Sequence, residues 1–324
     1  MNPPPLPTDP TERLQLGWEL NGLQDTNRQP WHLTASYQIF DSDGKSKDQG
    51  TFEEWWVSER DYKLVYHGSE FSQEEYGTDH GIFHSGAPGW PLDPLRLLRS
   101  AILQPVPSPE DIQDLDKQDL IRKFGTTELT CSALSRHGEK ADEDSISYCF
   151  DPKKPVLLYS NTRSLVRQTL FSHFFQFQGR YIPRDIQLYF QARPSLTIHI
   201  DTLEPLSEAS QLTTAVPADA IPVTKRISLS QVQSLSDTGR QIKKVAPKYP
   251  MEAKEAHIQG TVIFDATISR EGHIQSLRVL SGPLMLQQAA LDAVRQWVYK
   301  PYLLNGEPVE VDTEAYVIFS LGSR

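Results

Sequence analysis

The last third of the chain carries the pattern that most restricts its fold, because a hairpin, one long helix and a closing strand follow in a fixed order. Residues 260–268 and 274–281 predict two strands joined around Gly272, since glycine supplies the left-handed backbone of a tight turn. A helix is predicted over 286–297 and a last strand over 309–321. A unit with this order has to bury one face of its helix against a small sheet.

The predicted helix has a stripe of apolar positions. Ala290, Ala293, Val294 and Trp297 recur at the spacing i, i+3, i+4 and i+7, which places them on one helical face. The two alanines allow a close approach to the sheet, and Trp297 closes one end of the contact. Lys300–Pro301 is expected to stop the helix, because proline cannot continue it.

An extended segment leads into this unit. Pro250 biases Tyr249 away from helical backbone and cannot donate a hydrogen bond to a strand ladder. A short helix is expected directly afterwards, over 251–256.

Together these segments resemble the C-terminal domain of the TonB family, the periplasmic end of energy transducers. The resemblance covers about residues 240–321. It rests on the following runs of sequence: Pro247–Pro250, Gly260–Phe264, Gly272–Ile274, Arg278–Gly282 and Ala289–Pro301.

The resemblance implies a protein that binds a peptide and does no covalent chemistry. In the family the last strand lies at the sheet edge, and an extended peptide, the TonB box of an outer-membrane transporter, adds there as a new strand. Transferred to this chain, the contact residues are Tyr249, Pro250, Asp312, Glu314, Tyr316 and Ile318. Two alternatives stay open: Tyr249 only packs the lead-in segment, or the edge strand pairs with a second copy and forms a homodimer.

No apolar run approaches the roughly 20 residues of a membrane helix. The first residues, Met1–Pro5, also lack the charged and apolar regions of a signal peptide. We therefore expect a periplasmic chain whose signal peptide or N-terminal anchor has been removed. Natural transducers of the family carry an N-terminal membrane anchor, so this chain departs from the family pattern.

The formal net charge at pH 7 is −10, and the charged residues are unevenly distributed along the chain. Up to Gly239 the chain has 33 acidic and 22 basic residues, whereas from Arg240 it has 9 and 10. A basic stripe is missing, which argues against a nucleic-acid partner.

The two cysteines, Cys131 and Cys149, lie in segments that predict neighbouring strands, over 128–134 and 145–150. A polar loop between them would let the strands pair antiparallel with the cysteines opposite each other. We expect a disulfide, in keeping with an oxidising compartment. The alternative is two buried free thiols; a zinc site would need about four ligands, which these cysteines and His137 do not supply.

The front region predicts an antiparallel meander with a helix from Thr11 and a second helix over 93–103. Over roughly residues 10–205 it is similar to the LolA-like half-barrel of periplasmic lipoprotein carriers, on strand order and on Gly179–Ile186. The resemblance implies a curved sheet whose concave face is filled by helices or an acyl chain. Candidate cavity-lining residues are Trp55, Trp56, Phe171, Phe174, Phe175 and Phe177, which alternatively pack a dry core.

The predicted organisation is α+β: a flexible N-terminus (1–10), a LolA-like antiparallel β domain (11–205), a linker (206–239) and a TonB-like ββαβ domain (240–324). The leading functional hypothesis is a periplasmic TonB-like binding or energy-transducing protein that engages a TonB-box peptide or another envelope component, such as peptidoglycan. The alternative is a lipid or lipoprotein carrier that uses the front cavity.

Catalysis and cofactors are not expected. The chain has no G-x-S-x-G, P-loop, G-x-G-x-x-G or H-E-x-x-H motif. His67, His80 and His84 lie near Glu70, Glu74, Glu75 and Asp79, and we interpret them as scattered surface polarity rather than a metal site.

Overall fold

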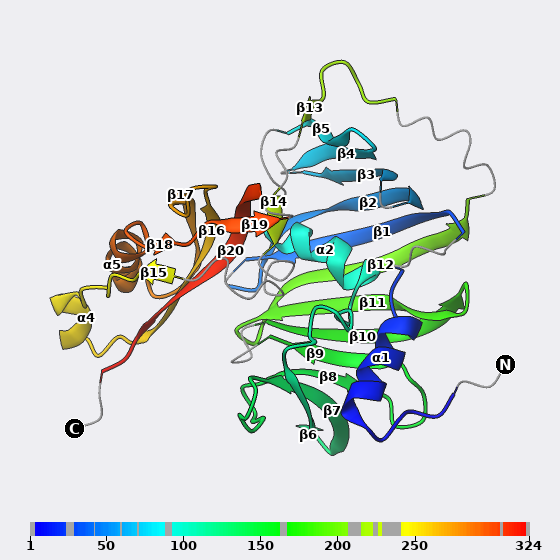
Figure 1. Cartoon of the computed structure of the whole chain (residues 1–324), viewed down its shortest axis with the longest axis horizontal. Coiled ribbons are helices and arrows are strands. Elements are labelled where there is room, and N and C mark those ends of the chain that lie inside the picture. Colours follow the sequence, from blue (N-terminus) through cyan, green and yellow to red (C-terminus); the bar gives the residue numbers. More distant parts are fainter. Residues whose placement is uncertain are drawn as a thin grey trace. The chain divides into compact units, whose positions relative to one another are not determined.

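The computed structural model (Figure 1) describes residues 4–23, 29–41, 43–58, 60–69, 71–87, 93–162, 167–206, 215–222, 226–228, 241–304 and 307–321. The chain divides into two compact units, Met1–Val223 and Thr224–Arg324, and each is described by itself. Most of the proposed linker and the first three residues lie outside the described ranges, so the predicted domain boundaries stay predictions. No helix in the described ranges is long and apolar enough to cross a membrane.

The first unit is built on a thirteen-stranded antiparallel sheet that curves around two helices (Figure 1). The strand order is β13-β5-β4-β3-β2-β1-β12-β11-β10-β9-β8-β7-β6, and its two end strands do not pair with each other. The strands are β1 (Trp31–Phe40), β2 (Ser46–Ser58), β3 (Asp61–Gly68), β4 (Ser72–Thr78), β5 (Gly81–Gly86), β6 (Asp116–Phe124), β7 (Thr127–Ser135), β8 (Ile146–Phe150), β9 (Leu157–Asn161), β10 (Arg167–Phe177), β11 (Arg180–Phe190), β12 (Arg193–Pro205) and β13 (Ile221–Pro222).

This order joins two sequential meanders. β1–β5 form one and β6–β12 form the other, and they meet along the pair β1–β12. That pair runs from Trp31 opposite Pro205 to Ile39 opposite Leu196. Each meander is local in sequence, whereas the pair that joins them connects residues far apart in the chain.

One face of the sheet forms the core, as the period-two pattern of β1 requires. Every second residue of β1, starting with Trp31, is buried. Helices α1 (Pro10–Leu20) and α2 (Asp93–Leu103) contribute to the same core. Their buried members are Leu14 from α1 and Leu95, Leu98 and Ile102 from α2.

Helix α1 is capped and held close to the sheet. The Asp9 carboxylate accepts hydrogen bonds from the backbone N–H groups of Thr11 (2.9 Å) and Glu12 (3.0 Å), which satisfies the first turn. A side-chain carbon at Gly17 would lie 2.5 Å from the Phe150 ring, so the close approach depends on glycine. The buried Arg13 donates to Asp119 on β6 at 3.0 Å, which fixes the helix over distant strands.

Helix α2 is attached to the sheet by a buried ion pair. Glu54 of β2 is fully buried, and the Arg99 guanidinium donates to its two carboxylate oxygens from Nε (3.1 and 3.2 Å) and Nη2 (2.7 Å). The guanidinium also lies over the Tyr62 ring at 4.6 Å. Burial raises the pKa of Glu54 although Arg99 opposes this shift. The pair therefore ties α2 to β2 and depends on both members.

The predicted disulfide is confirmed. Cys131 of β7 lies directly opposite Cys149 of β8, and the two sulfur atoms are bonded. Both cysteines are fully buried and belong to a small cluster with Leu129 and Tyr159.

The second unit has the predicted ββαβ order. Its hairpin strands β16 (Gly260–Ile268) and β17 (Ile274–Ser281) have the expected bounds, and they are followed by α5 (Leu284–Val294) and β20 (Glu307–Phe319). The sheet order is β14-β20-β16-β17, and β19 pairs with β20 in addition. The remaining elements are β14 (Arg226–Ser228), β15 (Gln241–Lys243), α4 (Met251–Glu255), β18 (Val298–Tyr299) and β19 (Tyr302–Leu304).

The apolar stripe of the main helix faces the sheet, as predicted. Ala290, Ala293, Val294 and Trp297 are all buried. The helix ends at Val294, three residues earlier than expected, because the chain then turns and extends into β18. Trp297 lies beyond the helix, where its indole N–H donates to the Val245 carbonyl at 2.9 Å. Trp297 therefore covers one end of the core from the turn that follows α5.

Candidate functional site: an edge of the C-terminal sheet

The last strand, β20, is not the outermost strand along its whole length. β16 covers one side of it, from Val311 opposite Ile268 to Phe319 opposite Gly260. On the other side, β14 pairs with residues 310–312. β19 pairs with residues 307–309, before the stretch that β16 covers. Within the described ranges, no strand lies on this second side beyond Asp312. The predicted edge is therefore partly occupied, at residues 310–312, by the chain's own β14.

The two faces of β20 differ in character. Val311, Ala315, Val317 and Phe319 are buried on one face, as strand alternation requires. The residues between them face outward: Tyr316 is 40% exposed and Ile318 is 72% exposed. The backbone of Asp312 and Glu314 lies in the same outward register, but their side chains lie outside the described part of the chain.

The outward face changes from polar to apolar along β16 and β20. At one end, Ser276 donates to Thr267 at 2.7 Å and Arg278 donates to Asp265 at 3.2 Å. Toward the other end, the positions opposite Tyr316 and Ile318 are Ile263 and Thr261. Ile263 is fully buried, so the exposed apolar groups at this end are Tyr316 and Ile318 of β20.

Tyr249 and Pro250 contribute to packing in this structure. The Tyr249 hydroxyl donates to the Ile258 carbonyl at 2.6 Å, and its ring meets the Phe319 ring edge-on at 5.2 Å. Pro250 caps α4, where its carbonyl accepts from the Lys254 N–H at 3.1 Å. Since Phe319 points into the core, Tyr249 lies on the opposite face of the sheet from Tyr316 and Ile318. The structure thus brings Tyr249 to the end of β20 but not onto its outward face.

The six candidate cavity-lining aromatics do not share one surface. Trp56, Phe171 and Phe177 are buried members of the main core, and Phe174 and Phe175 pack against it. Trp55 points to the other face of the sheet, where it stacks on His32 at 4.9 Å. The five residues on the core side contribute to a core that α1 and α2 also help to fill.

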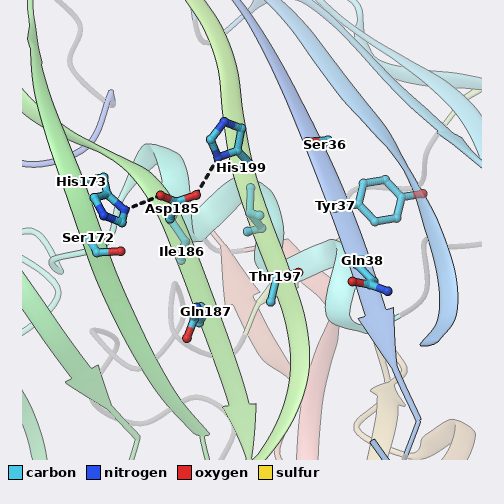
Figure 2. A pocket seen from close by; sticks show the side chains of 11 residues that line it. Ser36, Tyr37, Gln38, Ser172, His173, Asp185, Ile186, Gln187, Thr197 and His199 are labelled. Atoms are coloured by element: carbon cyan, nitrogen blue, oxygen red, sulfur yellow. Dashed lines mark hydrogen bonds and ion pairs between the residues drawn. The ribbon is translucent and has the colours of Figure 1, made fainter. Parts of the chain in front are cut away.

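A polar hollow on the outer face of the first sheet escaped the sequence analysis (Figure 2). It measures about 340 Å³ and lies across β1, β12, β11 and β10. At its centre, His173 and His199 donate from Nδ1 to the two carboxylate oxygens of Asp185, each at 2.6 Å. Partial burial opposes ionisation of Asp185, but the hydrogen bonds from the two histidines outweigh it and lower the pKa of this carboxyl.

Strand register creates this cluster, so the linear sequence gives no signal for it. His199 is the cross-strand partner of Asp185, whereas His173 sits in left-handed backbone (φ 53°) at an interruption of the β10–β11 ladder. No three described residues of the metal-binding types come close enough to hold a metal ion, here or near His67 and His84. The hollow offers hydrogen-bonding groups on its lining side chains.

Comparison with known proteins finds a family match within the second unit. Residues 245–321 match the family model for the Gram-negative bacterial TonB protein C-terminal, which confirms the predicted resemblance. The chain is 39% identical over 67 residues to protein TonB of Vibrio cholerae and 31% identical over 86 residues to protein TonB of Klebsiella pneumoniae. These matches span 20% and 26% of this chain but only 28% and 35% of the relatives.

Solved structures show similarity to both units. A LolA superfamily protein from Nitrosomonas europaea covers 62% of this chain and 94% of its own, with 7% identity and a TM-score of 0.42. The TonB C-terminal domain of Pseudomonas aeruginosa covers 30% of this chain and 96% of its own, with 23% identity and a TM-score of 0.26.

Proposed function

We propose that the second unit binds an extended peptide by strand addition to the outer side of β20. The observation that carries this proposal is β14: a three-residue segment from outside the family match already pairs with β20 at residues 310–312. That side of β20 therefore accepts a strand from elsewhere in the chain. Beyond Asp312 the described strands leave it open.

The chemistry of the site suits a peptide of loose sequence preference. Main-chain hydrogen bonds supply most of the affinity in strand addition, and pockets or patches for alternate side chains add selectivity. Here the outward-facing Ile318 and Tyr316 offer an apolar patch to such side chains. Asp312 and Glu314 share that register and complete the proposed contact. Tyr249 and Pro250 support the site indirectly, by fixing the end of β20 near Phe319.

The partner we propose is the TonB-box peptide of an outer-membrane transporter, and the compartment is the periplasm. Support comes from the family match over residues 245–321 and from the Cys131–Cys149 disulfide, which is typical of proteins outside the reducing cytosol. The role is binding, without covalent chemistry. The packed aromatics of the first unit give no specific support to a carrier function, so we propose no second one.

A peptide titration followed by NMR tests the proposal. A synthetic TonB-box peptide should shift or broaden the amide signals of Val309–Leu321 in the full chain. The matched control is the same peptide with proline at two adjacent central positions, because one of the two then lacks a ladder donor on the β20 side. Shifts of equal size with both peptides, or shifts confined to the first unit, would refute strand addition.

Self-association through the same edge gives a different result. A homodimer would change the mass measured by light scattering with protein concentration, and the signals of β20 would then move without any peptide. A monomeric mass throughout, with peptide-dependent shifts in β20, supports the proposed function.

A further inference from the structure

The segment that pairs with the edge of β20 precedes the family-matched domain. β14 (Arg226–Ser228) lies 17 residues before the first matched residue, Val245, and pairs parallel with β20. Arg226 is opposite Glu310, Ile227 is opposite Val311 and Ser228 is opposite Asp312. The chain thus supplies a strand to the same side of β20 that we propose for a visiting peptide.

β14 and the open stretch form one continuous edge. β14 takes residues 310–312 on the side of β20 away from β16, and no described strand pairs on that side from there on. A visiting strand of ordinary length has about five or six residues. If it paired along the whole proposed site, from Ile318 back to Asp312, it would reach the residues that β14 occupies. It would then meet β14, because two strands cannot occupy the same side of the same residues.

β14 can be held there and still be replaceable. Three paired residues make few hydrogen bonds, and each contributes little net stability in water. Covalent attachment compensates for this weakness, because a tethered segment acts at an effective concentration of about millimolar. An untethered peptide with more paired residues can therefore compete with β14.

We infer that β14 is an internal competitor, which occupies the start of the peptide-binding edge and has to leave before a visiting strand can use all of it. This inference rests on the proposed function of β20. Its consequence is quantitative: the apparent affinity for peptide is reduced by the fraction of molecules in which β14 has left the edge.

Two variants separate β14 from the rest of the site. In the first, Ile227→Pro is combined with Ser228→Pro; adjacent residues of a strand direct their N–H groups to opposite sides, so one proline removes a donor to β20 in either register. In the matched control, Ile227→Val is combined with Ser228→Thr, which retains both N–H groups and introduces residues that favour strands. Neither pair changes a residue of β20.

The affinity of the TonB-box peptide for the full-length variants is then measured by calorimetry. If β14 is paired in about nine molecules of ten, the proline variant should bind about tenfold more tightly than the unmodified chain. The control variant should bind like the unmodified chain. Amide hydrogen exchange at residues 310–312 reports independently whether the prolines have released β14.

A covalent lock tests the opposite direction. Arg226→Cys with Glu310→Cys places two cysteines at directly paired positions, and the oxidised form should bind peptide more weakly than the reduced form. The unmodified chain with and without reductant controls for the Cys131–Cys149 disulfide.

Failures of the two ideas look different. Released β14 with unchanged peptide affinity, or a lock without effect, overturns the internal competitor while the proposed function stands. An absence of binding in every form, the proline variant included, overturns the proposed function and the inference with it.

Discussion

Replacing Arg99 by methionine should destabilise the first unit more than any surface substitution. Glu54 is fully buried, and the Arg99 guanidinium donates hydrogen bonds of 2.7 to 3.2 Å to its carboxylate. Removing one member of a buried pair leaves an uncompensated charge, which costs about 3–5 kcal/mol. That is a large share of the roughly 5–15 kcal/mol that stabilises an ordinary domain.

The loss of stability in Arg99→Met should depend on pH, and it should be larger at higher pH. Burial already raises the pKa of Glu54, and loss of Arg99 removes the charge that opposes this shift. In Arg99→Met the folded state therefore keeps Glu54 protonated above about pH 4.3, the value at which the unfolded state releases this proton. The free energy of unfolding then falls as pH rises from the unfolded pKa of Glu54 to its folded pKa, by at most about 1.4 kcal/mol per pH unit. The variant should be closer to the unmodified chain at pH 5 than at pH 7.5.

Urea unfolding followed by tryptophan fluorescence measures this, since five of the six tryptophans precede residue 224. Glu54→Met combined with Arg99→Met is the matched control, because apolar residues of similar volume can replace a buried pair at little cost. A loss below about 1 kcal/mol in Arg99→Met, or a loss equal at both pH values, would show that Glu54 does not depend on Arg99 as the structure indicates.

Three further outcomes are expected. Replacing Cys131 and Cys149 by serine should lower the free energy of unfolding of the first unit by about 3 kcal/mol, measured in urea, because the loop of 18 residues is no longer closed in the unfolded chain. Ile318→Asp should weaken peptide binding several-fold in calorimetry and change stability by no more than about 0.5 kcal/mol, whereas Ile121→Asp, at a site of the first unit that is also largely exposed (63% against 72%), should leave binding unchanged. Asp185→Asn should cost about 0.5 kcal/mol at pH 6 and progressively less below about pH 4, measured by urea unfolding; the lowered pKa of Asp185 means that its contribution is present above the unfolded value and is lost as pH falls through the folded one.

Elements with strong local patterns could be predicted from the sequence. The hairpin strands β16 and β17 and the helix α2 have the bounds that their patterns indicate, because turn glycines and helix-start residues act over a few positions. The Cys131–Cys149 pair was predictable for the same reason: both strands lie within one short meander.

Features that depend on the exact register of strands, or on backbone irregularities, could not be predicted. The pairing of β14 with residues 310–312 joins segments more than 80 residues apart, and nothing in Arg226–Ser228 marks it as a strand of that sheet. The cluster around Asp185 requires the β11–β12 register and the left-handed His173, neither of which leaves a periodic trace. Trp55 and Trp56 are neighbours in the sequence, yet strand alternation directs their side chains to opposite faces of the sheet.

The pairing of β1 with β12 also fixes when the first unit can be completed during synthesis. Trp31 leaves the ribosome more than 160 residues before its partner in β12, and Gly17 of α1 has to wait for Phe150. Until β12 is available, the two meanders can form only separately, and β1 has no partner on that side. Pairing between strands so far apart in sequence is slow. A nascent chain stalled before residue 196 would thus contain most of the strands of the sheet and still lack the β1–β12 pair that completes its core.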